Sequence, residues 1–484
     1  MRFNFRMILH ILGLLILING AFMLITLLLS LLFKDGAHMG LAIAGGISLS
    51  IGALTWFATK KHEPTISKRE GFLVVTLGWL SLSLTGSLPY LFTGTLPDFA
   101  NAFFETVSGY TTTGATTITD LSLVPDSILF WRSLTQWIGG MGIIVLTIAI
   151  LPILGIGGME LFSAESPGPS ADKLHPRIKE TAKRLWFIYV SLTTIETILL
   201  KIAGMDTFEA VCHSMTTLST GGFSTRNESV AAFSPVVHYI ITLFMFLAGM
   251  NFALTYFAIK GKLKRVWINE EFRTFLISVI IVTLFATIGI AGSTGGFSEE
   301  SFRDALFQTV SIITTTGFVT ADYTSWTPFL TFLFFILMFV GASSGSTSGA
   351  MKQVRFIIVI KNGLLELKRQ LHPSAIIPVR FNRRSVGPKT TYNILAFFLL
   401  YITVFVAGGA ALSIFKDVDM LSAIGASAAS IGNIGPGIGK VGPMDNFSWI
   451  PDSGKVILAA LMLVGRLEMF TVLILFTPAF WRSV

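Results

Sequence analysis

Four short stretches, rich in Thr and Gly and embedded in apolar sequence, decide the fold of this chain. They read Thr111-Thr112-Thr113-Gly114, Thr220-Gly221-Gly222-Phe223, Thr315-Thr316-Gly317-Phe318 and Asn433-Ile434-Gly435-Pro436. Their anchor glycines are Gly114, Gly222, Gly317 and Gly435. The residues that precede each anchor align with one another without gaps. Repetition at fixed spacing indicates four copies of one structural unit.

Each copy begins with a short apolar helix. Sixteen residues before the anchors stand residues that favour helix N-caps, namely Asp98, Asp206, Ser301 and Asp419. The residues between cap and anchor are mostly apolar and contain few helix breakers. Each copy therefore predicts a helix of about twelve residues, or ~18 Å, which is roughly half the depth of a membrane.

The composition places these units in a lipid bilayer. The chain has 484 residues, of which 52% are hydrophobic and 13% charged, with 45 Gly and a mean hydropathy of +0.72. Soluble domains carry about 25% charged residues, which cover their surface. The composition therefore excludes an ordinary soluble enzyme, a disordered chain and a disulfide-rich secreted domain. The single cysteine, Cys212, cannot form an internal disulfide.

Ten apolar segments are long enough to cross a bilayer core of ~30 Å. They lie at 7–33, 38–58, 71–93, 128–154, 184–204, 234–258, 272–292, 328–362 (interrupted), 390–414 and 453–480. Each repeat is therefore a span, a half-helix, an extended strand and a second span, and two more spans lead the chain. We predict an all-α integral membrane protein with ten transmembrane helices, its four repeats arranged around one pore.

The repeats divide the chain into five segments. They are the two leading spans at 1–62, repeat one at 63–160, repeat two at 161–265, repeat three at 266–370 and repeat four at 371–484. If the first span runs outward, most of the 35 Lys and Arg residues fall on the inner side. This bias predicts that both termini are cytoplasmic. The net charge of +8 then reflects topology rather than a nucleic-acid-binding surface.

Irregular backbone at membrane depth is tolerated only where it is buried in protein or lines a water-filled path. Thr- and Gly-rich strands offer carbonyl and hydroxyl oxygens that can replace the water shell of an ion. The half-helices direct their negative dipole ends toward these strands, which favours a monovalent cation. Ordinary re-entrant turns in a packed transporter are the alternative, but four copies in register favour a pore. The predicted filter comprises Thr111, Thr112, Thr113, Gly114, Thr220, Gly221, Gly222, Thr315, Thr316, Gly317, Asn433, Ile434 and Gly435.

The second span of repeat three is interrupted by ten small residues at 341–350. Such a stretch is a poor helix, and we expect a loop under the filter that obstructs the pore. A close-packed helix interface is the alternative. The predicted gate comprises Gly341, Ser343, Ser344, Gly345, Ser346, Thr347, Ser348 and Gly349. Arg466, a cation inside the last span, joins them as a one-charge barrier, or else pairs with a distant acid to lock helices.

Several weaker sequence signals are not assigned to a functional site. Glu196 lies inside a span and serves either as a proton or sodium relay or as a structural hydrogen-bonding group. The string at 437–442 matches GxGxxG but lacks the strand and βαβ context of a dinucleotide site. Cys212 and His213 fall on a half-helix, where packing is expected. No catalytic constellation or organic cofactor site stands out, so we expect no enzymatic activity.

The repeats, the two leading spans and the strings TTTGATT, STGGFST, TTTGFVT and GNIGPGIG resemble the TrkH family, the membrane subunits of bacterial Trk-type potassium uptake systems. The resemblance covers nearly the whole chain. It implies K⁺ as the transported ion bound at the filter, a bacterial inner-membrane location, a homodimer with one pore per subunit, and a cytoplasmic nucleotide-binding ring resembling TrkA. The fourth repeat departs most from the pattern, because Asn433 and Ile434 replace threonines.

Two modes of transport remain open at this stage. The sequence favours channel-like permeation of K⁺ through the filter, controlled by the intramembrane gate and a cytoplasmic partner. An ion-coupled symporter that moves K⁺ with Na⁺ or H⁺ is the alternative. The polar inner loops at 160–183 and 361–389 suit docking of a soluble regulator, or simply carry the charge that orients the chain.

Overall fold

The structure is a computed structural model that describes residues 3–60, 67–142, 178–375 and 377–482. These residues are mostly helical. A two-stranded antiparallel hairpin pairs β1 (Arg380–Phe381) with β2 (Arg384–Ser385). Short helical turns complete the connections: α13 (Leu263–Ile268), α22 (Pro478–Trp481), η1 (Leu121–Leu123) and η3 (Ser229–Ala232).

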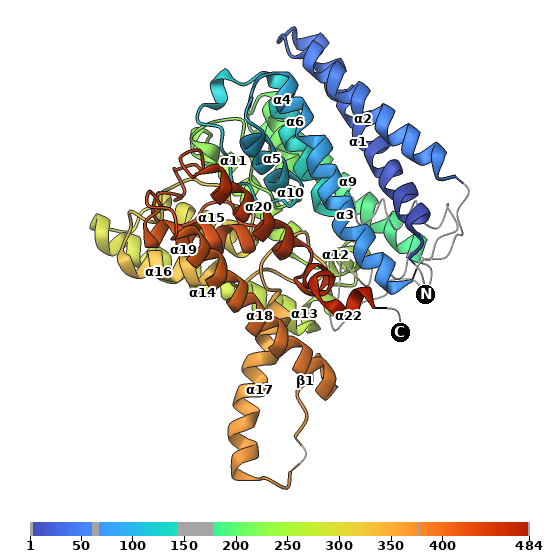
Figure 1. The fold of residues 1–484 in the computed structure, drawn as a ribbon. Helices are drawn as coiled ribbons and strands as arrows, with labels where there is room; N and C mark the ends of the chain where they lie inside the picture. Colours follow the sequence, from blue (N-terminus) through green and yellow to red (C-terminus); the bar gives the residue numbers. More distant parts are fainter. Residues whose placement is uncertain (1–2, 61–66, 143–177, 376, 483–484) are drawn as a thin grey trace.

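Within the described residues, six helical segments are long and apolar enough to cross a membrane. They are α1 (Phe5–Phe33), α2 (His38–Ala58), α3 (Lys68–Gly86) continued by α4 (Leu88–Phe92), α9 (Ile178–Ile202), α14 (Glu270–Thr294) and α18 (Pro388–Leu412). These correspond to the two leading spans and to the first span of each repeat. The α1–α2 pair lies along one edge of the molecule (Figure 1).

The second spans are broken, and two of them differ from the prediction of continuous helices. The helices α11 (Pro235–Gly249) and α12 (Phe252–Ile259) meet at 110°, as do α20 (Asp452–Arg466) and the segment Phe470–Phe476, which contains α21 (Phe470–Leu473) and η4 (Ile474–Phe476). At the first bend, the Asn251 side chain caps α12 by accepting a hydrogen bond from the Ala253 amide. At the second, Glu468 and Met469 adopt positive φ values of 61° and 44°, which end the helix.

The remaining two second spans are interrupted as well. After α6 (Asp126–Trp137) the helix loosens into a π-turn, Ile138–Gly142, and the rest of the expected span at 128–154 lies outside the described residues. The segment 328–362 is divided into α16 (Pro328–Leu337) and α17 (Gln353–Leu371). The described residues thus contain six spans, or up to eight if each bent pair counts as one. The ten-helix count stays a prediction.

The four half-helices are present: α5 (Phe99–Tyr110), α10 (Thr207–Leu218), α15 (Glu299–Ile313) and α19 (Met420–Ile431). Asp98, Asp206 and Asp419 accept backbone hydrogen bonds as N-caps, as predicted. The expected cap Ser301 is wrong, because α15 begins earlier and Ser298 caps it by accepting a hydrogen bond from the Ser301 amide. Glu299 and Glu300 in the first turn favour this earlier start, since negative charge stabilises a helix N-terminus.

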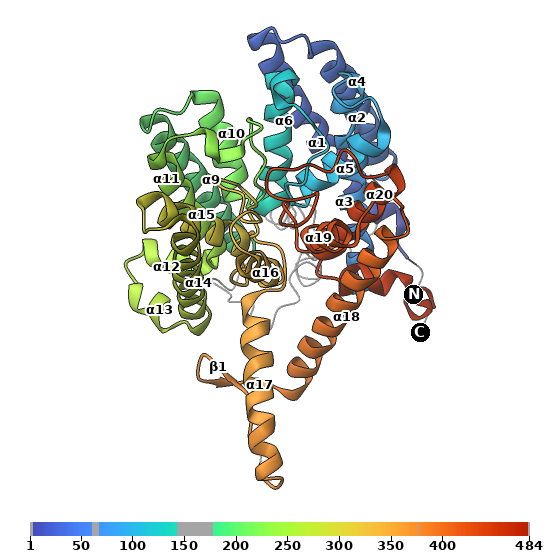
Figure 2. The same cartoon turned by 90° about the vertical axis from the view of Figure 1, so that its left-hand side faces the viewer.

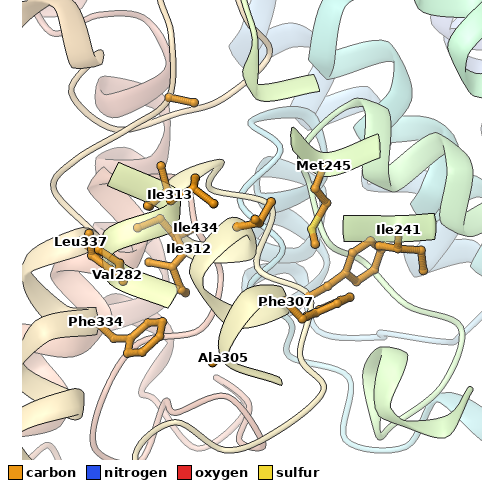
Figure 3. Packing of buried hydrophobic residues seen from close by; sticks show 14 of the residues in the cluster. Ile241, Met245, Val282, Ala305, Phe307, Ile312, Ile313, Phe334, Leu337 and Ile434 are labelled. Carbon is orange, nitrogen blue, oxygen red and sulfur yellow. The ribbon is translucent and has the colours of Figure 1, made fainter. Parts of the chain in front are cut away.

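The half-helices are packed between repeats. The second span of one repeat packs against the half-helix of the next, as in the pairs α6–α10, α11–α15 and α20–α5. Figure 2 shows the repeats gathered around a common centre, with α17 projecting away from the body. Figure 3 shows the apolar core around α15, in which Ile434 from repeat four lies beside Ile312 and Ile313. The rings of Phe3 and Phe480 are 5.7 Å apart, so the two ends of the described chain meet.

Candidate ion-binding site

All four half-helices end in the same way, four residues before their anchor glycine. The amide of the residue before each anchor bonds the carbonyl five residues earlier, in the pairs Thr113–Ser108 (2.8 Å), Gly221–Thr216 (2.8 Å), Thr316–Ser311 (2.8 Å) and Ile434–Ala429 (2.9 Å). The amide two before each anchor bonds the carbonyl three residues earlier, as in Thr112–Gly109 at 3.0 Å. This is the Schellman motif, which satisfies the last carbonyls of a helix.

The residue that follows each half-helix cap has a left-handed backbone. The φ values are 53° at Thr112, 55° at Thr220, 56° at Thr315 and 52° at Asn433. Three of these residues are threonines, whose branched Cβ disfavours this conformation. Backbone strain of ~1–3 kcal/mol per residue persists only where the surrounding structure imposes it, and it gathers at functional sites. In repeats one to three, the strand after the half-helix is therefore held in a backbone conformation that its threonine does not favour.

The four strands form a closed ring. A Cβ atom added at an anchor glycine would overlap a carbonyl oxygen of the next repeat, in the pairs Gly114–Gly221, Gly222–Thr316, Gly317–Ile434 and Gly435–Thr113. The last pair returns to repeat one. The anchors also have positive φ, from 73° at Gly222 to 97° at Gly435. Both conditions allow only glycine, because no other residue fits the space and the backbone together.

Side-chain oxygens add to this ring in two of the repeats. The hydroxyl groups of Thr111 and Thr113 are 2.8 Å apart, and those of Thr314 and Thr316 in repeat three are also 2.8 Å apart. In repeat four, the amide nitrogen of Asn433 donates to Thr113 Oγ1 at 3.0 Å. Ile434 instead turns into the apolar core (Figure 3). The predicted filter residues are thus gathered at one place, where backbone and hydroxyl oxygens are the available ligands.

The segment between α16 and α17 contains the predicted gate residues and lies against this ring. The amide of Gly349 donates to Thr315 Oγ1 at 2.6 Å, and the amide of Ala350 donates to the Gly432 carbonyl at 2.9 Å. A Cβ at Gly349 would overlap the Gly432 carbonyl and approach Asn433 Cβ to 2.8 Å. We name residues 341–350 the intramembrane loop.

Arg466 also forms hydrogen bonds that hold the intramembrane loop in place. Its Nη1 donates to the Thr347 carbonyl at 2.7 Å, and its Nη2 donates to the carbonyls of Gly139 at 2.9 Å and Gly140 at 3.2 Å. Thr347 Oγ1 in turn donates to the Leu218 carbonyl at 3.0 Å, at the end of a half-helix. Arg466 therefore connects repeat four, the loop and repeat one through backbone carbonyls.

Two residues that hold the loop were missed by sequence reasoning. Glu271 at the start of α14 is 3% exposed and accepts hydrogen bonds from the Ser344 amide (2.7 Å), the Ser344 hydroxyl (2.9 Å) and the Val354 amide (3.2 Å). Asn251 Nδ2 donates to the Ser344 carbonyl at 2.6 Å. Glu271 directly precedes an apolar span, so in the sequence it resembles an ordinary charged residue at the membrane surface. Only the bend between α11 and α12 brings Asn251 to the loop.

Other charges surround the loop. The Lys352 ammonium donates to the Ser348 carbonyl and to its hydroxyl, the latter at 3.1 Å. Arg355 pairs with Glu468 at the bend after α20. Lys352 thus contacts the intramembrane loop directly, whereas Arg355 joins the start of α17 to the bend after α20.

The weaker sequence signals take ordinary positions. Cys212 and His213 are buried on α10, and His213 Nδ1 bonds the Glu209 carbonyl at 2.8 Å within the same helix. The GxGxxG string forms a turn between α19 and α20, which the Gly437 amide closes on the Val441 carbonyl at 2.7 Å. In the described part of the chain, no group of three or more His, Cys, Asp or Glu residues could hold a metal ion.

Apolar helices of spanning length, together with four half-helices whose strands meet in one ring, define an integral membrane protein. The sequence matches the model of the TrkH family, described as a cation transport protein, over residues 37–483. This chain belongs to the TrkH family, as the sequence motifs predicted. Membership places it among transport proteins rather than enzymes.

Full-length relatives and a solved structure agree with this assignment. The Trk system potassium uptake protein TrkH of Escherichia coli K12 is 41% identical over 99% of this chain and 100% of its own. TrkH of Vibrio parahaemolyticus is 42% identical with the same coverage, and TrkG of E. coli K12 is 36% identical over 99% of both chains. The crystal structure of the potassium transporter TrkH from V. parahaemolyticus superposes with a TM-score of 0.89, at 40% identity, over 99% of this chain and 100% of that one.

Proposed function

We propose that this chain is the potassium-translocating membrane subunit of a Trk-type uptake system in the bacterial inner membrane, with both termini cytoplasmic. The observation that carries the proposal is the closed ring in which each anchor glycine meets a carbonyl of the next repeat. Relatives that are 36–42% identical over nearly the full chain are named potassium uptake proteins. The ring is the filter, and K⁺ is its transported ligand.

The physical basis of selection is oxygen coordination without fixed negative charge. In each strand, the anchor glycine and the residue two positions before it have positive φ, whereas the residue between them does not. Such alternation lets successive carbonyls point in one direction, toward an ion on the axis. The four half-helix C-termini add negative dipole ends beside the site. A weakly hydrated monovalent cation loses its water shell there at the lowest cost.

The intramembrane loop is the proposed gate. Its backbone bonds Thr315 and Gly432 beside the filter, and Arg466 holds it at Thr347. A loop in this position obstructs the path of an ion that leaves the filter, and the guanidinium of Arg466 adds electrostatic repulsion. Opening then requires the loop to leave at least one of these contacts.

Regulation is proposed to come from a cytoplasmic nucleotide-binding ring resembling TrkA, with two copies of this chain forming a homodimer. The helix α17 starts at the loop and projects from the body (Figure 1). Its outer half exposes an apolar stripe of Ile360, Leu364, Leu367 and Leu371. A partner bound there moves a helix that is continuous with the gate. The other predicted docking segment, 160–183, lies largely outside the described residues.

The test of this function is ion uptake by the purified chain in liposomes, with K⁺, Rb⁺, Na⁺ and Li⁺ compared at equal gradients. We expect K⁺ and Rb⁺ to enter faster than Na⁺ and Li⁺. A matched variant, Gly222→Ala, places a Cβ against the Thr316 carbonyl and is expected to abolish this order. Equal uptake of all four ions by the unaltered chain would contradict the proposal.

A symporter coupled to Na⁺ or H⁺ is the second candidate, and one observation favours it. Glu196 is fully buried in α9 beside Thr217, and among the described residues its carboxyl oxygens make no hydrogen bond of normal geometry. Ionisable groups inside membranes often mark proton or ion relays. Glu196→Gln should abolish uptake that depends on a second gradient, and it should leave uptake unchanged if the chain is a channel.

A further inference from the structure

A buried ion pair lies directly behind the first filter strand. Glu105 on α5 and Arg132 on α6 are 0% and 2% exposed, and the Arg132 Nε atom lies 2.6 Å from Glu105 Oε1. Neither residue belongs to the filter or to the intramembrane loop. Replacing such a pair with well-packed apolar residues is often neutral or stabilising, so stability alone does not account for its presence.

The two members of the pair hold two different filter strands. Glu105 accepts hydrogen bonds from Thr116 Oγ1 at 2.9 Å and from the Thr117 amide at 2.8 Å, in the strand that follows Gly114. Arg132 Nη1 donates to the Ser224 carbonyl at 2.9 Å, in the strand that follows Gly222. The centre of its guanidinium lies 3.6 Å from the centroid of the Phe223 ring.

The fourfold repeat supplies an internal comparison. Nine residues before the anchors stand Glu105, His213, Gln308 and Ala426. We use the word brace for a side chain at this position that bonds a filter strand. His213 Nε2 lies 3.1 Å from Ser224 Oγ, so repeat two has a weaker brace than repeat one. Gln308 is fully buried and makes no side-chain hydrogen bond with the described residues. Ala426 has no polar group. The brace is therefore concentrated on the first two strands.

We propose that Glu105 and Arg132 are positioning residues that set the ion selectivity of the filter by fixing the strands of repeats one and two against each other. The inference rests on the proposed function, because it assumes that the ring selects ions. One way in which a ring of oxygens discriminates against a smaller ion is to resist contraction around that ion. The ion pair supplies this resistance from outside the ring, without touching the permeating ion.

The test compares ion uptake by reconstituted variants in liposomes. Glu105→Gln keeps an acceptor oxygen but removes the charge that Arg132 pairs with. The double variant E105Q/R132M removes both charges, so no unpaired buried charge is left, and it carries the test if the single variant does not fold. Gln308→Met is the matched control, since it alters the equivalent buried position of repeat three, where no brace exists.

We expect the K⁺-over-Na⁺ uptake ratio to fall about tenfold in E105Q and in E105Q/R132M, which corresponds to ~1.4 kcal/mol. Thermal unfolding of the purified variants separates this effect from misfolding. The Q308M ratio should match that of the unaltered chain. A folded double variant with an unchanged ratio, or an equal loss in Q308M, overturns the inference. If the unaltered chain itself does not discriminate K⁺ from Na⁺, the proposed function fails first.

Discussion

The backbone amide of Gly349 donates a hydrogen bond to Thr315 Oγ1 at 2.6 Å, and this bond joins the intramembrane loop to the ring of four strands. Thr315 is also one of the residues with a left-handed backbone, at φ 56°. Because the contact involves a residue of the proposed filter, displacement of the loop changes the surroundings of the ring itself. The proposed gate and the proposed filter are thus joined by a direct hydrogen bond in repeat three.

Substitution of Gly349 should release the loop. In Gly349→Ala the new methyl group meets the Gly432 carbonyl, so the loop must shift and lose its bond to Thr315. Loss of about 1 kcal/mol from the closed state raises basal K⁺ flux roughly fivefold. Gly363→Ala in α17 is the control, because its Cβ meets no atom within 4 Å. Equal flux in both variants would contradict a gating role for this contact.

Arg466→Ala should raise conduction further. It removes three hydrogen bonds to the carbonyls of Thr347, Gly139 and Gly140 together with the charge near the path. Hydrogen bonds from a charged group contribute ~1.5–3 kcal/mol each, so we expect at least about a tenfold increase in flux. Arg466→Lys keeps the charge, but its single ammonium cannot contact both the Thr347 and the Gly139 carbonyls. Its flux should therefore lie between that of R466A and that of the unaltered chain. An R466A protein that folds and conducts less than the unaltered chain would rule out the barrier.

Glu271→Ala should loosen the intramembrane loop and the start of α17. The carboxylate accepts hydrogen bonds from the amide and hydroxyl of Ser344 and from the amide of the buried Val354, and the substitution removes this acceptor. We expect a lower thermal stability, by roughly 1–3 kcal/mol, and a higher basal flux. Glu366→Ala controls for the loss of an acidic side chain, because the Glu366 carboxylate contacts Arg369 and Gln370 within α17. Stability loss without any change in flux would assign Glu271 a structural role only.

The N-cap of α10 gives a pH-dependent prediction. Backbone amides of Phe208 and Thr207 lower the pKa of Asp206, so its carboxylate stabilises the folded state above the unfolded-state pKa of ~3.9. That contribution is lost as the pH falls through the lower folded-state pKa. Asp206→Ala should therefore cost about 1 kcal/mol at pH 7 and clearly less near pH 3.

Thermal unfolding in detergent at both pH values measures the Asp206 effect. Asp417→Ala is the control, since Asp417 is exposed and precedes a different half-helix without capping it. It should leave stability unchanged at either pH. A constant difference between D206A and the unaltered chain across this range would exclude the carboxylate as the stabilising group.

The half-helices and anchors could be predicted because their signals are local. Asp98, Asp206 and Asp419 are N-caps, and the glycines mark helix ends at constant spacing. The prediction of Ser301 as an N-cap is wrong, because Ser298, three residues earlier, caps α15 and the acidic pair Glu299–Glu300 occupies its first turn. The closing of the ring was suggested only by the repetition itself.

The contacts of the intramembrane loop could not be predicted, because they depend on tertiary bends. The sequence around Asn251 reads as a continuous apolar span, yet the chain turns by 110° there and places this side chain on Ser344. Arg466 was identified by its charge alone, but its three carbonyl partners come from two other repeats. Ile434 likewise gives no local sign that it turns into the core around α15.

The most direct test of potassium conduction is the reversal potential of the purified chain in a planar bilayer, with K⁺, Na⁺ and pH gradients set independently. A conducting filter predicts a reversal potential that follows the K⁺ gradient alone and stays fixed when the Na⁺ or H⁺ gradient is inverted. A reversal potential that shifts with either of those gradients would contradict channel-like permeation and favour the coupled transporter.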